Sequence, residues 1–285
     1  FSYRELLEGP GFGLRRNQML DAFAWLLVEL HLTGCFWGDC SLSNVLYRYD
    51  ADAIETIMVD GETAEVQTAL TDGRRAEDIQ IMIQNVAGGM ADIAALQGFD
   101  LDEADLHLGE DIAERYFALW DEINQKLVIG PEDRWRIRDR IERLNDLGVS
   151  VDEVELQPAG DGQHLKVKIK IGVRDFHARK LEELTGVRAL DQQARYILGD
   201  LHYFSARQQQ DRDHTIDAIR WRVEEFRPLL RRLEGNTRVS DPIQAYCDIL
   251  HHRFVLSRAA GLDVGTTAAV DNWFATGQPG YPLTS

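Results

Sequence analysis

Apolar residues recur at intervals of three or four positions along much of the chain, which is the period of an α-helix. Residues 14–33 begin this pattern: Leu20, Phe23 and Leu30 fall on one face, and Gly34 follows as a typical helix stop. Helices are predicted over residues 14–33, 75–97, 102–126, 131–147, 176–185, 190–208, 212–234, 240–260 and 265–275.

Short β-prone segments interrupt the helical pattern at two places. The first helix is followed by CFW, NVLYRY and ETIMVD, in which Val, Ile, Thr and Tyr cluster. In LKVKIKIGV, apolar residues alternate with lysines, as in a half-buried strand, and Asp161-Gly162 just before it is a hairpin turn signal. The pattern predicts a β-hairpin at about residues 151–173 and a mainly α fold with small β elements (α+β).

Acidic residues are concentrated in the first half of the chain. Residues 1–130 carry 24 acidic and 8 basic side chains, a balance of −16, whereas residues 131–285 carry 24 and 23, a balance of −1. The shift coincides with Gly130-Pro131, so we expect two domains, 1–129 and 130–285, the second rich in helix and containing the hairpin. Since binding to phosphate backbones depends on Lys and Arg, no nucleic-acid partner is expected.

The composition also bears on the location of the protein. No run of apolar residues approaches the about 18 that span a bilayer, so no transmembrane segment is expected. The three cysteines are too few for a disulfide framework and lack metal-ligand spacing, which favours a reducing cytoplasm.

Two carboxylates and an amide lie at suggestive positions after the first helix. Asp39 follows a short strand, Asn44 stands five residues later, and Asp60 ends an apolar run before Gly61 and Glu62. Chain order of this kind can bring the three side chains to one edge of a small sheet. Carboxylate and amide oxygens suit Mg²⁺, and a nearby carboxylate can accept a proton from a hydroxyl. The alternative is that all three only cap turns, as Asp and Asn readily do.

These residues carry a resemblance to a known superfamily. The pattern Trp37-Gly38-Asp39-x-x-x-x-Asn44 resembles the catalytic loop of protein-kinase-like enzymes. The segment VDGE, residues 59–62, is similar to the Asp-x-Glu metal segment of small-molecule kinases. The resemblance implies a kinase-like C-lobe that uses ATP and Mg²⁺, with Asp39 as the catalytic base and Asn44 and Asp60 as metal ligands. Glu62 would support a second metal.

A nearer resemblance is to a bacterial group described as lipopolysaccharide (Kdo) kinase-like, with an appended C-terminal domain of unknown function. The stretches that carry it are residues 36–44, 59–63, 72–78 and 85–89. In the second half, similar stretches include RLNDLG at residues 143–148, LTG at 184–186 and QAR at 193–195. The resemblance implies transfer of phosphate from ATP to a hydroxyl acceptor, such as a sugar or a lipid-linked glycan. It also implies that a nucleotide-clamping lobe, where one exists, precedes Phe1.

Three departures keep a second hypothesis open, and the first is that no Gly-rich phosphate loop precedes the site in this sequence. Trp37 stands where kinases usually have His, so a hydrogen bond that braces the catalytic loop is lost or replaced. The first lysine of the chain is Lys126, so no lysine of this sequence precedes the site. The alternative function is therefore a pseudokinase-like interaction module, without catalysis, that binds a protein partner through its C-terminal domain.

Five arginines crowd residues 134–143 among acidic neighbours, at Arg134, Arg136, Arg138, Arg140 and Arg143. Ion pairs at i,i+4 spacing on a solvated surface are the expected arrangement. The alternative is that these arginines, with Lys166, Lys168 and Lys170, form a surface for an anion such as a lipid or polyphosphate headgroup.

Overall fold

The computed structural model confirms a mainly α architecture with small antiparallel β elements. It describes residues 2–3, 12–98, 100–101, 103–125, 127–130, 135–146, 151–158, 164–171, 175–207 and 214–281. The chain divides into two compact units. Unit 1 contains residues 1–48, 54–173 and 283–285, and unit 2 contains Tyr49–Ala53 and Arg174–Pro282.

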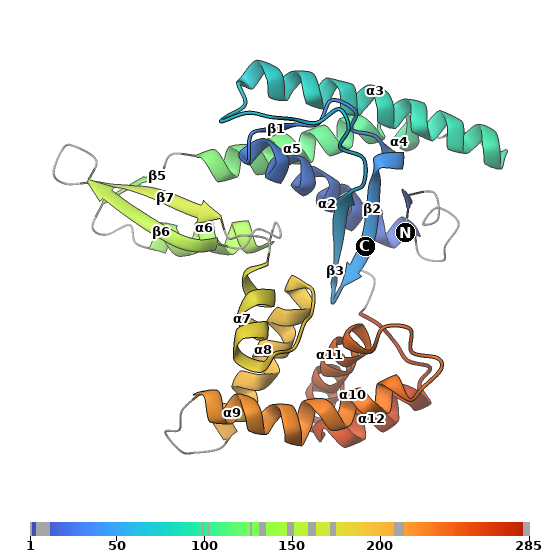
Figure 1. The fold of residues 1–285 in the computed structure, drawn as a ribbon, viewed down its shortest axis with the longest axis vertical. Helices are drawn as coiled ribbons and strands as arrows, with labels where there is room; N and C mark the ends of the chain where they lie inside the picture. Colours follow the sequence, from blue (N-terminus) through green and yellow to red (C-terminus); the bar gives the residue numbers. More distant parts are fainter. Residues whose placement is uncertain are drawn as a thin grey trace. The chain divides into compact units, whose positions relative to one another are not determined.

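Three long helices form the core of unit 1. They are α2 (Phe12–Leu32), α3 (Asp72–Gln97) and α5 (Leu108–Asn124), with the short α4 (Glu103–Leu106) between the last two (Figure 1). Helix α5 packs against both α2 and α3. Their apolar faces supply the buried side chains that the helical period predicts, including Phe23, Leu27, Met82, Val86 and Ile112.

Local capping fixes the limits of α3. The Thr71 side chain accepts a hydrogen bond from the Arg74 backbone N–H, and Gly98 ends the helix in a left-handed conformation (φ 71°). The Gly98 N–H donates to the Ala94 carbonyl at 2.8 Å, which satisfies one of the open carbonyls of the last turn.

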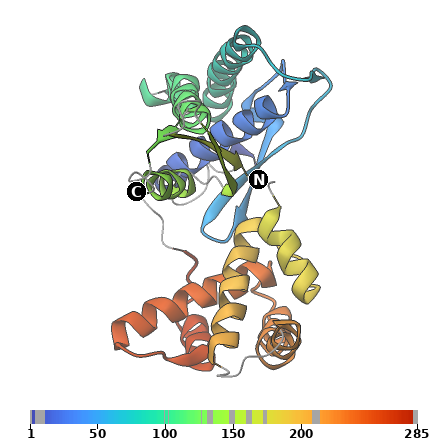
Figure 2. The same ribbon diagram turned by 90° about the vertical axis from the view of Figure 1, so that its left-hand side faces the viewer.

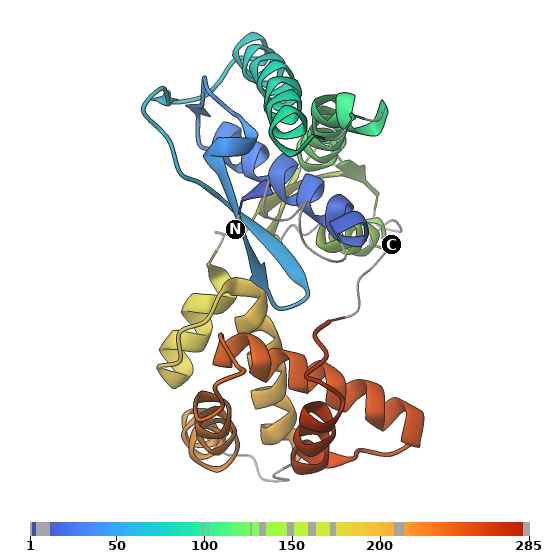
Figure 3. The ribbon, with the colours of Figure 1, turned by 90° about the vertical axis from the view of Figure 1, so that its right-hand side faces the viewer.

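Two small antiparallel pairs lie between α2 and α3 in the chain. Strand β1 (Cys35–Phe36) pairs with β4 (Glu65–Val66), and β2 (Val45–Asp50) pairs with β3 (Ala53–Met58), as predicted for the segments CFW, NVLYRY and ETIMVD. A single 3-10 turn, η1 (Leu42–Asn44), precedes β2. The ribbon of the β2–β3 hairpin is seen in Figure 3. The hydroxyl of Thr56 in β3 donates to the Ala22 carbonyl of α2, which fastens the hairpin to this helix.

The predicted hairpin is present and gains a third strand. Strands β6 (Val151–Pro158) and β7 (Leu165–Ile171) are antiparallel, and β5 (Leu127–Ile129) adds to the free edge of β7. Helix α6 (Trp135–Asp146) lies between β5 and β6 in the chain.

One arginine of α6 corrects the expectation of a solvated basic surface. Arg140 is buried, with 1% of its surface exposed. Its guanidinium donates to the carbonyls of Glu122 and Ile123, in the last turn of α5, because helix C-terminal carbonyls lack partners within the helix. Arg136 and Arg138 are exposed, as expected, whereas Arg134 lies outside the described residues.

Unit 2 is built from helices, as the sequence predicts. They are α7 (Phe176–Thr185), α8 (Asp191–Arg207), α9 (His214–Trp221), α10 (Arg227–Glu234), α11 (Pro242–Ala260) and α12 (Gly265–Ala275). Helix α8 contacts α7, α9 and α11 (Figure 2). The start of α11 follows from sequence: Asp241 accepts hydrogen bonds from the N–H groups of Ile243 and Gln244, with Pro242 at the first helical position.

The helix predicted over residues 212–234 is not continuous in hydrogen bonding. A π-helical segment, η2 (Arg222–Phe226), separates α9 from α10. Pro228 lies just after it. Proline has no N–H to donate four residues back, so the wider π turn accommodates the missing bond without ending the helix.

The division into units differs from the predicted domain boundary near residue 129. Residues 130–173, including the three-stranded sheet, group with unit 1, and the tip of the β2–β3 hairpin groups with unit 2. The domain assignment 1–129 and 130–285 stays a prediction.

Helix α3 is relevant to the prediction that the chain has no transmembrane segment. Among the described helices, it is the one long and apolar enough to cross a bilayer by length and composition, with 33% of its most apolar window buried. A core helix passes the same test, so the predicted absence of a transmembrane segment stays a prediction.

Candidate functional site

A glycine with a special backbone conformation presents Asp39 to solvent. Gly38 has φ 79°, a left-handed conformation that favours glycine. An added Cβ would lie 3.1 Å from the Phe36 ring and 3.3 Å from the Thr63 carbonyl oxygen. The loop therefore turns sharply after the buried Trp37 and leaves the Asp39 side chain exposed.

Two amides hold the Asp39 carboxylate. Asn44 Nδ2 donates to Asp39 Oδ2 at 3.2 Å and to the Asp39 carbonyl at 3.0 Å. Asn85 Nδ2, from α3, donates to the other carboxylate oxygen, Oδ1, at 3.2 Å. Since each oxygen has its own donor, the orientation of the carboxylate is fixed before any substrate arrives.

The indole of Trp37 joins the Asp39 loop to the Asp60 segment. Trp37 Nε1 donates to the Asp60 carbonyl at 2.8 Å, and the Thr63 hydroxyl donates to the Trp37 carbonyl at 2.8 Å. The expectation that Trp37 loses or replaces a bracing hydrogen bond is thus resolved: the indole N–H makes a bracing bond here.

Asp60 and Glu62 both extend to solvent. Asp60 Oδ1 accepts from the Glu62 backbone N–H at 3.1 Å, which shapes the turn after β3. The Glu62 side chain is exposed and makes no side-chain hydrogen bond or ion pair with other residues that the structure describes. The Asn44 carbonyl accepts from the Val59 N–H at 3.1 Å, so the backbones carrying Asn44 and Asp60 run together.

A buried carboxylate supports the loop from the side opposite to solvent. Asp78 of α3 is fully buried and accepts hydrogen bonds from Trp37 N (2.8 Å), Gly38 N (2.9 Å) and His31 Nε2 (3.0 Å). Three donors compensate for removing this carboxylate from water.

The histidine beside Asp78 is itself held by a tyrosine. His31 Nδ1 lies 2.7 Å from the Tyr116 hydroxyl. Burial raises the pKa of Tyr116, so its hydroxyl stays protonated. Because the Asp78 carboxylate can only accept, we assign a ring proton to His31 Nε2, which donates it to Asp78. Helices α2, α3 and α5 thus all contribute to the position of the Asp39 loop.

Sequence reasoning identified Asp39, Asn44, Asp60 and Glu62, but it gave no role to Asp78 or Asn85. These two residues are seven positions apart, two helical turns, and so share one face of α3. Both lie in stretches that carry the family resemblance, DGRRAED and NVAGG. The family resemblance of these two stretches was therefore the one sequence signal for Asp78 and Asn85. Neither residue has the spacing of a metal ligand or a catalytic residue within its stretch.

The oxygen atoms of the Asp39 loop and the Asp60 segment are of the type that binds a hard cation. Asn44 Oδ1 and the Asp60 carboxylate are oxygen ligands, and Mg²⁺ bound to phosphates typically uses only one or two carboxylates. Among the residues with described positions, no three His, Cys, Asp or Glu side chains gather closely enough to hold a metal by themselves. The set therefore fits a cation that is shared with phosphate better than a closed protein cage.

The cations next to the loop already have partners. Arg74 lies over the Phe36 ring at 3.6 Å and pairs with Glu65 and Glu77. Arg75 pairs with Asp72 and lies over the Trp120 ring. Neither is an uncommitted charge for a phosphate.

Cys40, within the same loop, is not set up as a nucleophile. Burial raises the pKa of its thiol well above the ordinary value, and the charges of Asp78 and Asp39 raise it further. The thiol therefore stays protonated, whereas a reactive cysteine needs the thiolate.

The fold and site define a mainly α protein of two units, with a carboxylate–amide loop braced from within unit 1. A family model matches residues 118–277, more than half of the chain, and the chain belongs to that family, which is described as a domain of unknown function (DUF4032). No curated protein and no solved structure matches it. The loop residues, from Asp39 to Asn85, precede the matched span.

Proposed function

We propose that unit 1 is a kinase-like phosphotransfer site that uses ATP and Mg²⁺ to phosphorylate a hydroxyl, such as that of a sugar or a lipid-linked glycan. The observation that carries the proposal is the fixed Asp39 carboxylate, held by the amides of Asn44 and Asn85 and joined to the Asp60 segment through Trp37. An exposed, oriented carboxylate can accept the proton of an acceptor hydroxyl, and the Asn44 amide and the Asp60 carboxylate are oxygen ligands of the kind that bind Mg²⁺.

In the proposed reaction, Asp39 accepts the proton of the acceptor hydroxyl. The hydroxyl oxygen bonds to the γ-phosphorus of ATP, the bond from that phosphorus to the bridging oxygen breaks, and ADP leaves. Asn44 and Asp60 are the proposed ligands of Mg²⁺, which supplies positive charge to the phosphate oxygens, and Glu62 would support a second ion. Asn85 and Asp78 act through Asp39 and its loop, and are positioning residues.

A second candidate is a pseudokinase-like module that binds a protein partner without catalysis. Trp37 in place of the usual His favours this candidate. The committed ion pairs of Arg74 and Arg75 favour it too, because phosphoryl transfer depends on charge neutralisation.

Calorimetric titration of the full native protein with ATP tests the first candidate. We expect binding that requires Mg²⁺ and that weakens at least tenfold in Asp60→Asn, which keeps the size of the side chain but removes its charge. Asp92→Asn, an exposed carboxylate elsewhere on α3, is the matched control and should bind as the unaltered protein does. Absence of binding to the folded protein, or equal binding by Asp60→Asn, would reject the nucleotide site and favour the interaction module.

A further inference from the structure

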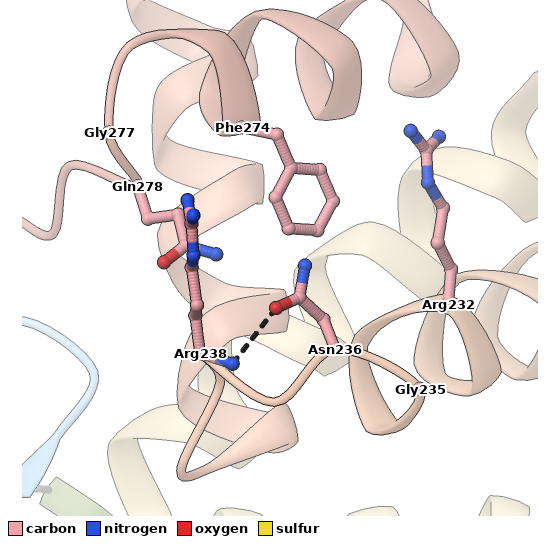
Figure 4. A pocket seen from close by; sticks show the side chains of 7 residues that line it. All are labelled: Arg232, Gly235, Asn236, Arg238, Phe274, Gly277 and Gln278. Carbon is pink, nitrogen blue, oxygen red and sulfur yellow. Dashed lines mark hydrogen bonds between the residues drawn. The ribbon is translucent and has the colours of Figure 1, made fainter.

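A cavity of about 650 Å³ lies in unit 2, between the C-terminal ends of α10 and α12 (Figure 4). Its size falls within the range typical of sites for small organic ligands. The residues that line it are Arg232, Gly235, Asn236, Arg238, Phe274, Gly277 and Gln278.

The side chains that line the cavity are rich in hydrogen-bond donors and include no carboxylate. Arg232 Nη2 forms an ion pair with Oδ1 of Asp271, a residue of α12, at 2.7 Å. The Arg238 guanidinium makes no hydrogen bond or ion pair with any residue in the described part of the chain, although its own backbone N–H donates to Asn236 Oδ1. Arg238 is exposed, so its charge is accessible to a ligand that enters the cavity.

Gln278 adds a second donor without an acceptor. Its Nε2 is shielded from solvent and has no hydrogen-bond partner. A buried amide left unpaired is unfavourable, so a rotation of the Gln278 side chain that brings Nε2 to a ligand acceptor would be favoured. The backbone of Gln278 is left-handed (φ 61°), an uncommon conformation for a residue with a side chain, and its N–H is fixed by a 2.8 Å bond to the Trp273 carbonyl.

The ring of Phe274 supplies an apolar wall. Figure 4 shows the ring between Arg232 on one side and Arg238 with Gln278 on the other. The Arg232 guanidinium carbon lies 5.4 Å from the ring centroid.

The carbonyl groups at a helix C-terminus carry partial negative charge and repel anions. This repulsion must be compared with the attraction of the arginines. Turn amides already occupy the last carbonyls: Gly235 N–H donates to Arg231 and Asn236 N–H to Leu233, while Gln278 N–H donates to Trp273. The remaining dipole effect is equivalent to about half an elementary charge per helix and falls off within one turn. The full charge of Arg238, which has no acidic partner among the described residues, exceeds the dipole effect of either helix, whereas the charge of Arg232 is shared with Asp271.

We propose that this cavity binds a small organic phosphate, with the phosphate contacted by Arg238, Gln278 and Arg232 and the organic part lying on Phe274. Guanidinium groups on two sides of the cavity, together with an amide donor, match a group with three terminal oxygens and about −1.5 to −2 charges better than a carboxylate with two oxygens. The site is separate from the Asp39 loop, so its test is independent of the proposed phosphotransfer.

Calorimetry with phenyl phosphate on the full protein is the primary test, with benzoate as the carboxylate counterpart. Vesicles of phosphatidylcholine with and without phosphatidic acid form a second arm, which distinguishes a lipid headgroup from a soluble phosphate. We expect phenyl phosphate or the phosphatidic acid vesicles to bind, and benzoate to bind at least tenfold more weakly than phenyl phosphate. Absence of binding in both arms, or benzoate binding as tightly as phenyl phosphate, would overturn the proposal.

Three variants assign the binding to this cavity. Arg238→Gln removes the unpaired charge, and Gln278→Gly removes the amide while keeping a residue that readily adopts the left-handed backbone. Each should weaken binding at least tenfold. Arg231→Gln alters an exposed arginine of α10 that does not line the cavity, and it should leave the affinity unchanged. Equal losses in Arg231→Gln and Arg238→Gln would show general charge attraction and overturn the site.

Discussion

Asp78 shows how much one buried side chain contributes to the shape of the candidate site. It receives donors from the backbone of the Asp39 loop and from His31, so it links α2 and α3 to the loop in one cluster. A carboxylate can accept from all three because it has four lone-pair positions and no proton to donate.

Asp78→Asn tests this support. The amide group of Asn would turn a donor toward donors, so we expect the free energy of unfolding to fall by about 2–4 kcal/mol. Urea unfolding followed by circular dichroism measures the change. Asp92→Asn, on the exposed face of the same helix, should change stability by less than about 0.5 kcal/mol, and a similarly small effect for Asp78→Asn would contradict the role assigned to it.

Glu225, in the π segment of unit 2, predicts a dependence of stability on pH. Burial raises the pKa of this carboxyl, and the charge of Asp200 raises it further. The other charged groups that act on it are Arg253, Arg207 and Glu224. Because the folded state binds the proton more tightly than the unfolded state, stability falls as the pH rises from the unfolded pKa through the folded pKa.

Glu225→Gln removes that loss. Above the folded pKa the variant should be more stable than the unaltered protein, by less than about 1 kcal/mol because solvent partly screens the group. At about pH 4, below the unfolded pKa, the two proteins should be equally stable. Urea unfolding at about pH 4 and about pH 7.5 makes the comparison. A variant that is less stable at the higher pH would show that the Glu225 charge is favourable.

The residues of the Asp39 loop and the Asp60 segment could be predicted from the sequence, whereas the residues that hold the loop in place could not. Asp39, Asn44, Asp60 and Glu62 could be named because each lies at a boundary between predicted elements. Asp78 and Asn85 could not, since their partners are 40 to 47 positions away in the chain and depend on how α3 packs. The buried Arg140 was missed for the same reason: its acceptors are carbonyls of another helix.

At the scale of elements, the long helices and the β6–β7 hairpin were predictable, and the shortest strands were not. The bounds of α3 and α11 were predicted to within a few residues from the helical period of apolar residues, the capping residues and the glycines that end helices. Strand β5 was missed because three residues carry too little pattern, and its partner β7 is distant in sequence. The π segment depends on the hydrogen bond that Pro228 cannot make, whereas apolar periodicity continues through it.

A close approach of α3 and α5 gives a second stability test. A Cβ added to Gly109 of α5 would lie 2.8 Å from the Cα of Ile83, which is backbone and cannot rotate away. Gly109→Ala should therefore destabilise the protein by about 1–3 kcal/mol, although alanine favours helix.

Gly88→Ala is the matched control for Gly109→Ala. Gly88 is also within a helix, α3, but nothing lies within 4 Å of its added Cβ. This variant should gain about 0.5–1 kcal/mol, since alanine loses less backbone entropy on folding. Thermal unfolding of both variants would reveal opposite shifts, and a stabilising Gly109→Ala would contradict the observed helix contact.

At the scale of the whole molecule, the chain contributes to unit 2 at two separate places. The segment Tyr49–Ala53 groups with unit 2, where buried Asp50 accepts from the N–H groups of Gln192 (2.9 Å) and Gln193 (2.7 Å) at the start of α8. The Gln244 side chain of α11 bonds both the N–H and the carbonyl of Ala51. Composition and charge could not predict this, because they changed only near residue 130.

Asp50→Ala should therefore loosen a helix more than 140 positions away. We expect about 1–3 kcal/mol lower stability of unit 2, through the loss of two capping bonds to a buried acceptor. Hydrogen exchange of α8 amides should accelerate, while that of α3 amides should not. Arg48→Ala, which removes a surface ion pair with Glu55 on the same hairpin, should leave α8 exchange unchanged. Unaltered α8 exchange in Asp50→Ala would contradict the capping role.

Because unit 2 is built from two separate segments of the chain, its structure constrains which parts of the gene can be transferred to another gene by recombination. The span that defines the family, residues 118–277, does not include residues 49–53. A recombination event that moved only the family span to another protein would leave α8 without its capping carboxylate and Gln244 without its backbone partners. The two segments are therefore expected to be inherited together, and a transferred copy would persist where the recipient supplies an equivalent acidic hairpin.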